Sequence, residues 1–228
     1  MAGLEIKQKR SFHPIRWAIW VTLLGLLAAS AYYGYRWFMT GELPPIPVVK
    51  ATTVGLPDVE ETVVTGGQVR AHTVPATHPR YISIPSIGVE QTRVFPVGVT
   101  KNNVLDTPKN IHDAAWYSKS ATPGSGYGAV LIDAHNGGYT KDGIFAKLSK
   151  LAKGDEISVE RGDGKVFTYI VTSNVTMGLD EVNERGMKEM MVSSDSSKEG
   201  LSLITCAGNY VPRLGQFDKR VMVRAVVK

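Results

Sequence analysis

Residues 201–206 read Leu-Ser-Leu-Ile-Thr-Cys, an apolar run that ends on Cys206, the only cysteine of the chain. A short apolar run of this kind is typical of a buried strand. A single thiol cannot form an intramolecular disulfide, so Cys206 is either an inert buried side chain or a reactive group. The Ala-Gly-Asn sequence at 207–209 predicts a turn directly after it. Because a rigid sheet can hold a nucleophile at a strand end while it faces a cleft, this position favours the reactive interpretation.

Two other segments combine a strand pattern with a chemically useful side chain. Residues 130–135 read Val-Leu-Ile-Asp-Ala-His, and His135 is followed by Asn-Gly-Gly. Residues 217–223 read Phe-Asp-Lys-Arg-Val-Met-Val, so Arg220 opens an apolar run. Imidazole titrates near neutral pH and can move a proton. A guanidinium stays charged and offers a planar fork of donors, which suits a carbonyl oxygen that is becoming negative.

These three segments resemble the motifs of the sortase family, the membrane-anchored cysteine transpeptidases of bacterial cell surfaces. The family's motif T-L-x-T-C is matched by Ser-Leu-Ile-Thr-Cys at 202–206, with Ser202 in place of the first threonine. The family's histidine ends an earlier strand, as His135 is predicted to do, and its arginine lies on the strand after the cysteine, as Arg220 does. The resemblance covers about residues 79–228 and implies an all-β fold, a closed barrel of about eight strands.

The resemblance also implies the roles of the site residues. Cys206 would attack a scissile carbonyl, His135 would protonate the leaving amine, and Arg220 would stabilise the oxyanion. The side chain of Thr205 and the backbone N–H of Ala207 would bind the substrate. No cofactor and no metal is expected, because one cysteine cannot build a zinc cluster and the acidic residues near 180–184 are expected to be solvated.

Each role has competing candidates among residues of the same type. Arg224 shares a strand face with Arg220, because the two residues are four positions apart. Asp133 shares the strand face of His135 and either orients the imidazole or is solvated, so it is left out of the catalytic set. The remaining competitors are His112, interpreted as a surface or loop histidine, and Arg213.

An apolar stretch near the N-terminus predicts a membrane anchor. Residues 17–35 contain no charged side chain, which is just enough for a helix to cross a bilayer, and aromatic residues flank the stretch at both ends. Basic residues precede it, whereas only Arg36 closely follows it, so the positive-inside rule predicts a cytoplasmic N-terminus. The alternative is a signal peptide cleaved at Ala-Ser-Ala, 29–31. The aromatic residues after that site favour the uncleaved anchor.

The rest of the chain divides into two parts that differ in composition and in hydrophobic periodicity. Residues 39–78 are rich in Pro, Gly, Val and Thr without sustained periodicity, which predicts a spacer or, alternatively, an extension packed on the domain. Later residues predict short strands, with a hairpin at Gly-Asp-Gly, 162–164, and a short helix over 144–151. Prolines in two of the strands indicate edges or bulges. The predicted parts are a cytoplasmic N-terminus (1–16), a transmembrane anchor (17–38), an extracytoplasmic spacer (39–78) and a catalytic domain (79–228).

The resemblance implies a single-pass enzyme with its catalytic domain outside the cell. It would cleave a C-terminal sorting signal of exported proteins through a thioacyl-enzyme and transfer the acyl group to an amine of a cell-wall precursor or pilin, with hydrolysis as a side reaction. A net charge of +5 with interleaved acidic and basic residues argues against a nucleic-acid partner. The alternatives are a non-catalytic, membrane-tethered peptide-binding barrel and an L,D-transpeptidase. The latter would carry His shortly before Cys, where this chain has Ile204 and Thr205.

Overall fold

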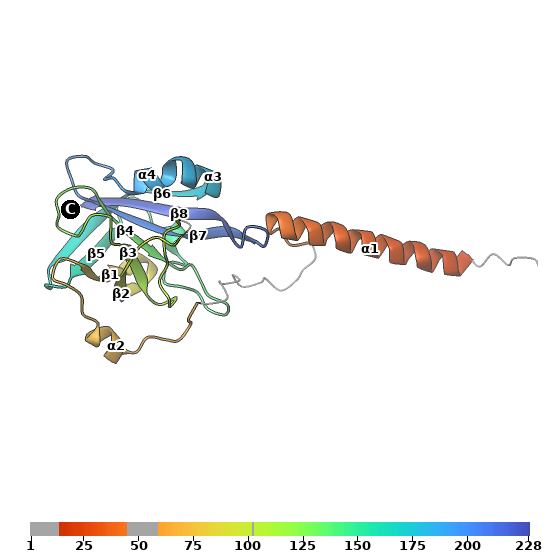
Figure 1. Ribbon diagram of the computed structural model, residues 1–228, viewed down its shortest axis with the longest axis horizontal. Helices are drawn as coiled ribbons and strands as arrows, with labels where there is room; N and C mark the ends of the chain where they lie inside the picture. Colours follow the sequence, from red (N-terminus) through yellow and green to blue (C-terminus); the bar gives the residue numbers. More distant parts are fainter. Residues whose placement is uncertain (1–13, 45–58, 102) are drawn as a thin grey trace, which may run out of the picture.

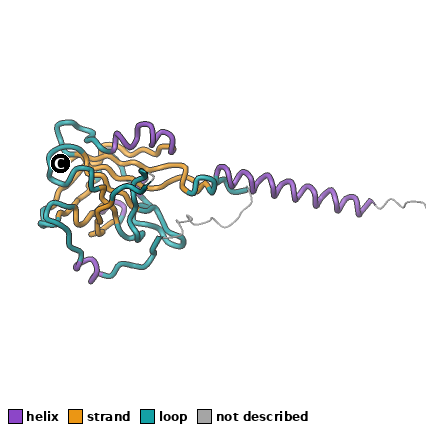
Figure 2. Tube along the Cα trace, viewed as in Figure 1, coloured by secondary structure: helices purple, strands orange, loops and turns teal. Residues whose placement is uncertain are grey.

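Eight strands close into one barrel, as predicted for the all-β domain (Figures 1 and 2). The computed structural model describes residues 14–44, 59–101 and 103–228. The order of the strands around the barrel is β1-β2-β3-β4-β7-β8-β6-β5. The strands are β1 (Pro79–Ile84), β2 (Val89–Val97), β3 (Ala114–Tyr117), β4 (Ala129–Ala134), β5 (Glu156–Arg161), β6 (Val166–Gly178), β7 (Gly200–Val211) and β8 (Gln216–Val227).

Most neighbouring strands are antiparallel, but β2 pairs with β3, and β4 with β7, in parallel. The residues of β2 up to Arg93 pair with β1, whereas those from Val94 onward pair with β3. Pro96 therefore lies where pairing with β1 has ended, and its missing N–H breaks no ladder on that side. The β5–β6 hairpin turns at Gly162–Gly164, as the sequence predicts, and Gly164 has a positive φ of 82°.

The barrel wall separates two apolar clusters. Alternate residues of β4, β7 and β8 belong to the interior cluster: Val130, Ile132, Leu201, Leu203, Val221 and Val223. The intervening residues Leu131, Ile204 and Met222 lie on the outer face and pack with Val182 and Met190. This outer cluster lies next to the end of the sheet where the candidate site residues gather.

Short helices cover part of the outer face. The connection from β6 to β7 contains α3 (Leu179–Glu181), the π-helix η3 (Val182–Gly186) and α4 (Met187–Met190), which lie over β6 and β8 (Figure 1). Two 3₁₀ helices, η1 (Pro85–Ile87) and η2 (Leu148–Lys150), complete the domain. The helix predicted over 144–151 is wrong in extent, because only η2 and turns form there. Its apolar residues Phe145, Leu148 and Leu151 are all buried in the barrel core. They reach the core from turns and a short 3₁₀ helix, without a regular α-helix.

The N-terminal helix α1 (Pro14–Thr40) extends away from the barrel (Figure 1). It is the candidate membrane span: its length and hydropathy suffice to cross a bilayer, and none of its residues is buried. Its C-terminal end meets the β7–β8 hairpin, where the Arg213 N–H donates to the Phe38 carbonyl at 3.2 Å. Most of the predicted cytoplasmic N-terminus, residues 1–13, lies outside the described residues.

Residues 59–78 lie against the barrel. This segment contains α2 (Gly66–Ala71), and beyond that helix the buried His72 places Nε2 3.0 Å from the Val94 carbonyl. The Tyr81 hydroxyl in β1 donates to the Val69 carbonyl. These contacts attach the segment to β1 and β2. Residues 45–58 of the region predicted as a spacer lie outside the described residues.

Candidate active site

Three adjacent strands bring the predicted catalytic residues into one row on the outer face of the barrel. Cys206 in β7 is the cross-strand partner of Arg220 in β8. The β4–β7 pairing ends at Asp133 with Ile204, and the same register continued by two residues would place His135, which directly follows β4, beside Cys206. Neighbouring strands are separated by about 5 Å. The sheet therefore gathers a thiol, an imidazole and a guanidinium that are far apart in the sequence.

The Cys206 thiol is half-buried. Burial raises its pKa to about 11, while the nearby Arg220 lowers it and the carboxyl of Asp133 raises it. At neutral pH the thiol is therefore mostly protonated in this state. A thiolate at this position requires both the positive charge of Arg220 and an acceptor for the proton.

His135 is buried, with 6% of its surface exposed, and its orientation is fixed by one hydrogen bond. Its Nε2 lies 2.7 Å from the backbone carbonyl of Pro108. A carbonyl oxygen only accepts, so Nε2 carries the hydrogen and Nδ1 is left as the proton-accepting nitrogen. Burial lowers the pKa of His135, and the bond to Pro108 opposes that shift. The imidazole is therefore biased toward its neutral form.

Arg220 is held by its own hairpin. Its Nη1 donates to the carbonyls of Phe217 and Lys219 at 2.9 and 2.8 Å, and its Nη2 donates to Oε1 of Gln216 at 3.0 Å. These bonds preorganise the guanidinium next to Cys206 before any substrate binds. Its remaining N–H groups have no partner among the hydrogen bonds of the described residues.

The competing arginines lie elsewhere. Arg224 pairs across the strands with Ser202, not with Cys206, and donates to the Val192 carbonyl at 3.2 Å. It therefore holds the end of the β6–β7 helical connection. Arg213 is exposed at the hairpin tip, where its backbone meets the end of α1. Arg220 and Arg224 share a strand face, so alternation along the strand does not distinguish them. The cross-strand register favours Arg220, because only Arg220 lies opposite Cys206.

The two residues predicted to bind substrate have different surroundings. Thr205 is buried, and its hydroxyl donates to the Ala134 carbonyl at 2.7 Å, directly before His135. This bond ties β7 to β4 and leaves the hydroxyl engaged inside the protein. Ala207 is half-buried, with its side chain against the barrel core and its backbone opposite Lys219. The backbone N–H of Ala207 remains the candidate donor to an oxyanion.

His112 does not join the row. It is half-buried and lines a cavity of about 430 Å³ together with Val63, Val64 and Asp142. Its Nε2 is buried and makes no hydrogen bond among the described residues. Cys206 does not line this cavity, whereas His135 directly follows β4, the strand that pairs with β7.

Asp133, which is not among the predicted catalytic residues, lies close enough to Cys206 and Arg220 to interact with them electrostatically. Only 9% of its surface is exposed, and it lies on the outer face of β4 two residues before His135. Burial raises its pKa to about 7, while the charge of Arg220 and the backbone of Ala134 lower it. The sequence signal was present, because Asp133 and His135 share one strand face. The alternation along the strand does not show whether the Asp133 carboxyl is solvated or buried, because its burial depends on residues from other segments that cover it.

Asp133→Asn should make the protein more stable than the wild type at about pH 8.5 and leave its stability nearly unchanged at about pH 3. The folded protein holds the Asp133 proton with a pKa of about 7 instead of the usual 3.8. Its contribution to stability is therefore fully present below pH 3.8 and is lost progressively as the pH rises from 3.8 to about 7, and an amide avoids that loss. One pKa unit corresponds to about 1.4 kcal/mol, so a difference on the order of 2–4 kcal/mol is expected in urea unfolding at the higher pH. An effect of equal size at both values would contradict the buried, protonated carboxyl.

Comparison with known proteins agrees with this fold. A family model described as Sortase domain matches residues 82–228. Sortase A from Corynebacterium diphtheriae, a lid mutant, is similar at 22% identity over 71% of this chain and 75% of that chain, with a TM-score of 0.50. Sortase C of Streptococcus pneumoniae is similar at 20% identity over 83% of this chain and 82% of that chain, with a TM-score of 0.49. No curated protein matches the sequence.

The domain match includes the whole of the row formed by β4, β7 and β8, and it spans well over half of the chain. The sortase A structure aligns with this one at low sequence identity, so it bears on the fold alone. The match of the family model supports more than the fold, because it rests on the sequence of the domain itself. This chain belongs to the sortase family.

Proposed function

We propose that the protein is a cysteine transpeptidase that uses Cys206 as nucleophile, His135 as proton shuttle and Arg220 as oxyanion partner. The observation that carries the proposal is the Cys206–Arg220 cross-strand pair with His135 on the neighbouring strand end. The thiolate of Cys206 adds to the scissile carbonyl carbon. Arg220 and the backbone N–H of Ala207 stabilise the resulting oxyanion. His135 then protonates the amine as the C–N bond breaks, which leaves a thioester on Cys206.

The second half of the reaction reverses these roles. The amine of an acceptor attacks the thioester carbonyl, His135 accepts its proton, and the C–S bond breaks to return the thiol. Because the pKa of Cys206 lies near 11 and that of His135 is lowered, the thiolate–imidazolium pair is a minor form of the resting enzyme. Arg220 supports that form by lowering the pKa of the thiol. Water in place of the amine gives hydrolysis as the side reaction.

The outer face beside the row suits an extended peptide. Four apolar side chains pack at the edge of the outer cluster and stay partly exposed: Leu105, Tyr117, Met187 and Met191. Methionines adapt to different side chains, and apolar surface beside a nucleophile can bind the residues that precede a scissile bond. The proposed substrates are exported proteins with a C-terminal sorting signal, and the proposed acceptor is an amine of a cell-wall precursor or pilin. The β6–β7 connection, residues 179–200, is the proposed determinant of the sorting motif.

The proposed location is the cell membrane, with α1 as a single-pass anchor, the N-terminus in the cytoplasm and the barrel outside. The apolar helix supports the anchor, and the basic residues before it support the orientation. A reporter fused after Lys228 should behave as extracytoplasmic, and the protein should stay at full mass in the membrane fraction. Recovery of a soluble form that begins near Tyr32 would instead show cleavage at residues 29–31.

The proposed activity can be tested with a peptide library on the full-length protein in detergent. Mass spectrometry should detect a cleaved peptide and an acyl group added to Cys206, and an added amine should shift the product from the hydrolysed to the aminolysed form. Binding without any covalent adduct would support the alternative of a peptide-binding barrel. Acylation by a D-amino-acid peptide stem alone would support the L,D-transpeptidase alternative.

Arg220→Lys should lower kcat by about 100-fold or more with a small change in KM. A lysine keeps the charge but loses the planar fork that bonds Phe217, Gln216 and the oxyanion at once. The matched control is Arg224→Lys, which keeps a cation able to donate to Val192 and should be nearly silent. If Arg224→Lys were the damaging change, the assignment of the oxyanion partner would be wrong.

A further inference from the structure

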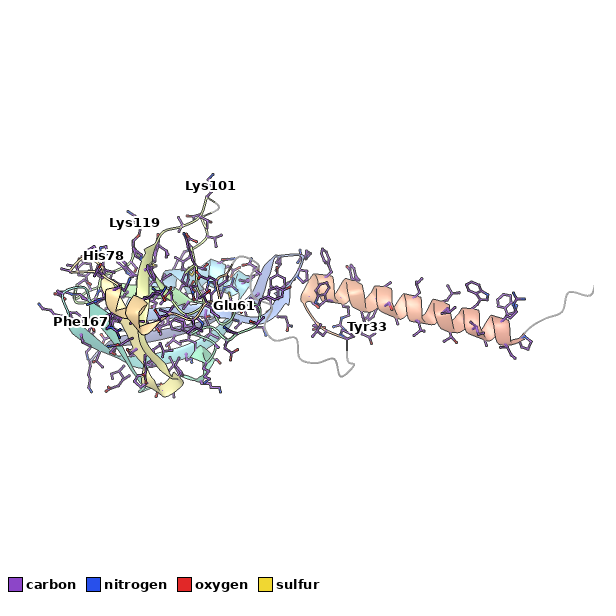
Figure 3. All side chains as sticks on the ribbon, turned by 90° about the horizontal axis from the view of Figure 1, so that it is seen from below. Tyr33, Glu61, His78, Lys101, Lys119 and Phe167 are labelled. Atoms are coloured by element: carbon purple, nitrogen blue, oxygen red, sulfur yellow. The ribbon has the colours of Figure 1, made fainter. Side chains whose placement is uncertain are left out.

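The segment Val59–Val64, here called the arm, precedes the barrel and lies outside the residues matched by the family model. It forms no part of the barrel ladder, yet it bonds to two loops that are distant from it in the sequence. Both loops adjoin His135. Figure 3 labels Glu61 at the end of the barrel that faces α1.

The first loop carries the carbonyl that orients the imidazole. Glu60 brackets this loop, because its N–H donates to the Lys109 carbonyl at 2.9 Å and its carbonyl accepts from the Ile111 N–H at 3.0 Å. The Nδ2 of the buried Asn110 donates to the Thr62 carbonyl at 2.9 Å. Pro108, whose carbonyl lies 2.7 Å from Nε2 of His135, directly precedes this bracketed stretch.

The second loop follows His135 and is held by the carboxylate of Glu61. The Thr140 N–H donates to Oε1 of Glu61 at 2.9 Å, and the Thr140 hydroxyl donates to Oε2 at 2.5 Å. The loop folds back on itself, with a bridge between Gly137 and Asp142. Gly138 is buried under Glu61, and a Cβ at Gly138 would lie 2.3 Å from Oε1. Any larger residue at 138 would force the carboxylate of Glu61 to shift from this position.

The loop also returns to the backbone of the histidine. The Phe145 N–H donates to the His135 carbonyl at 3.1 Å, and the Gly143 N–H donates to the Asn136 carbonyl at 3.0 Å. A Cβ at Gly143 would lie 2.2 Å from the His135 oxygen. The arm thus fixes the imidazole from one side through Pro108 and the backbone of His135 from the other side through the loop tip.

We propose that the arm is a brace for the active site and that Glu61 is a positioning residue for His135. This inference rests on the proposed function. Its physical basis is that a proton shuttle loses much of its effect when its ring is displaced by about 1 Å. The barrel ladder ends at Ala134, so the ladder alone does not hold the residue that follows it. The hydrogen bonds of the arm supply that restraint.

The test uses the full-length protein in detergent with the variants Glu61→Ala and Glu61→Gln. Glu61→Ala should lower kcat by about tenfold at nearly constant KM, because the brace affects proton transfer and not peptide binding. Glu61→Gln should restore most of that loss, since its amide can accept from the Thr140 N–H and donate to the Thr140 hydroxyl. The matched control is Asp163→Ala, which removes another carboxylate that bonds a backbone N–H, at the β5–β6 hairpin.

A second measurement does not depend on turnover. Backbone hydrogen exchange over residues 135–145 should become faster in Glu61→Ala and stay unchanged in Asp163→Ala. Wild-type kcat in Glu61→Ala, or equal losses in Glu61→Ala and Asp163→Ala, would overturn the brace. If the wild type formed no acyl-enzyme with any peptide, the proposed function would fail. The exchange measurement would still decide whether Glu61 holds the loop.

Discussion

Replacing Cys206 by alanine should abolish acyl-enzyme formation and peptide cleavage while the barrel stays folded. The thiol is the sole nucleophile in the proposed mechanism, and the variant keeps the Cβ at a half-buried position on the outer face of β7. Loss of one sulfur atom there leaves the interior cluster untouched, so the thermal midpoint should change little. Intact-mass spectrometry after incubation with a sorting peptide measures the adduct directly.

The control for this variant is a change at a neighbouring outer-face position that does not carry the chemistry. Met222→Leu lies across from Ile204 on β8, conserves volume and should keep the adduct. Turnover by Cys206→Ala at the wild-type rate would end the assignment of the nucleophile. An adduct on any residue other than Cys206 would have the same consequence.

His135→Ala should lower the rate of acylation by about 10²–10⁴-fold, the usual cost of losing a general acid or base. Without the imidazole the thiol loses its proposed proton acceptor, and the pKa of the thiol near 11 leaves little thiolate at neutral pH. Raising the pH should therefore recover part of the activity of this variant, since hydroxide removes the proton instead. Single-turnover acylation rates between about pH 7 and pH 10 measure this effect.

His112→Ala is the matched control for the histidine. His112 lies within the same domain but lines the cavity beside Val63 and Val64, and it has no place in the row of β4, β7 and β8. Its replacement should leave the acylation rate and its pH dependence unchanged. A large loss in His112→Ala together with a small one in His135→Ala would reverse the assignment of the proton shuttle.

Local sequence features already determined much of this protein. The apolar runs before Cys206 and before His135 predict buried strands, and both form, as β7 and β4. The turn predicted at 207–209 is wrong, because β7 continues to Val211 with only an irregularity in its pairing between Ala207 and Tyr210. The Gly-Asp-Gly sequence predicts the β5–β6 hairpin, and the uncharged stretch near the N-terminus predicts the helix that became α1. These features are readable because each depends on residues a few positions apart: alternation along a strand, a positive φ in a turn, or the length of an apolar helix.

Only the tertiary structure decided which residues meet. Strand parity left Arg220 and Arg224 equivalent, and the β7–β8 register places Arg220 opposite Cys206. The burial that raises the pKa of Asp133, and the hydrogen bonds of Glu61, come from segments far away in the chain. A sequence pattern fixes which face a side chain takes, because that depends on its own strand. Its partners and its exposure depend on register and covering segments, which long-range packing sets.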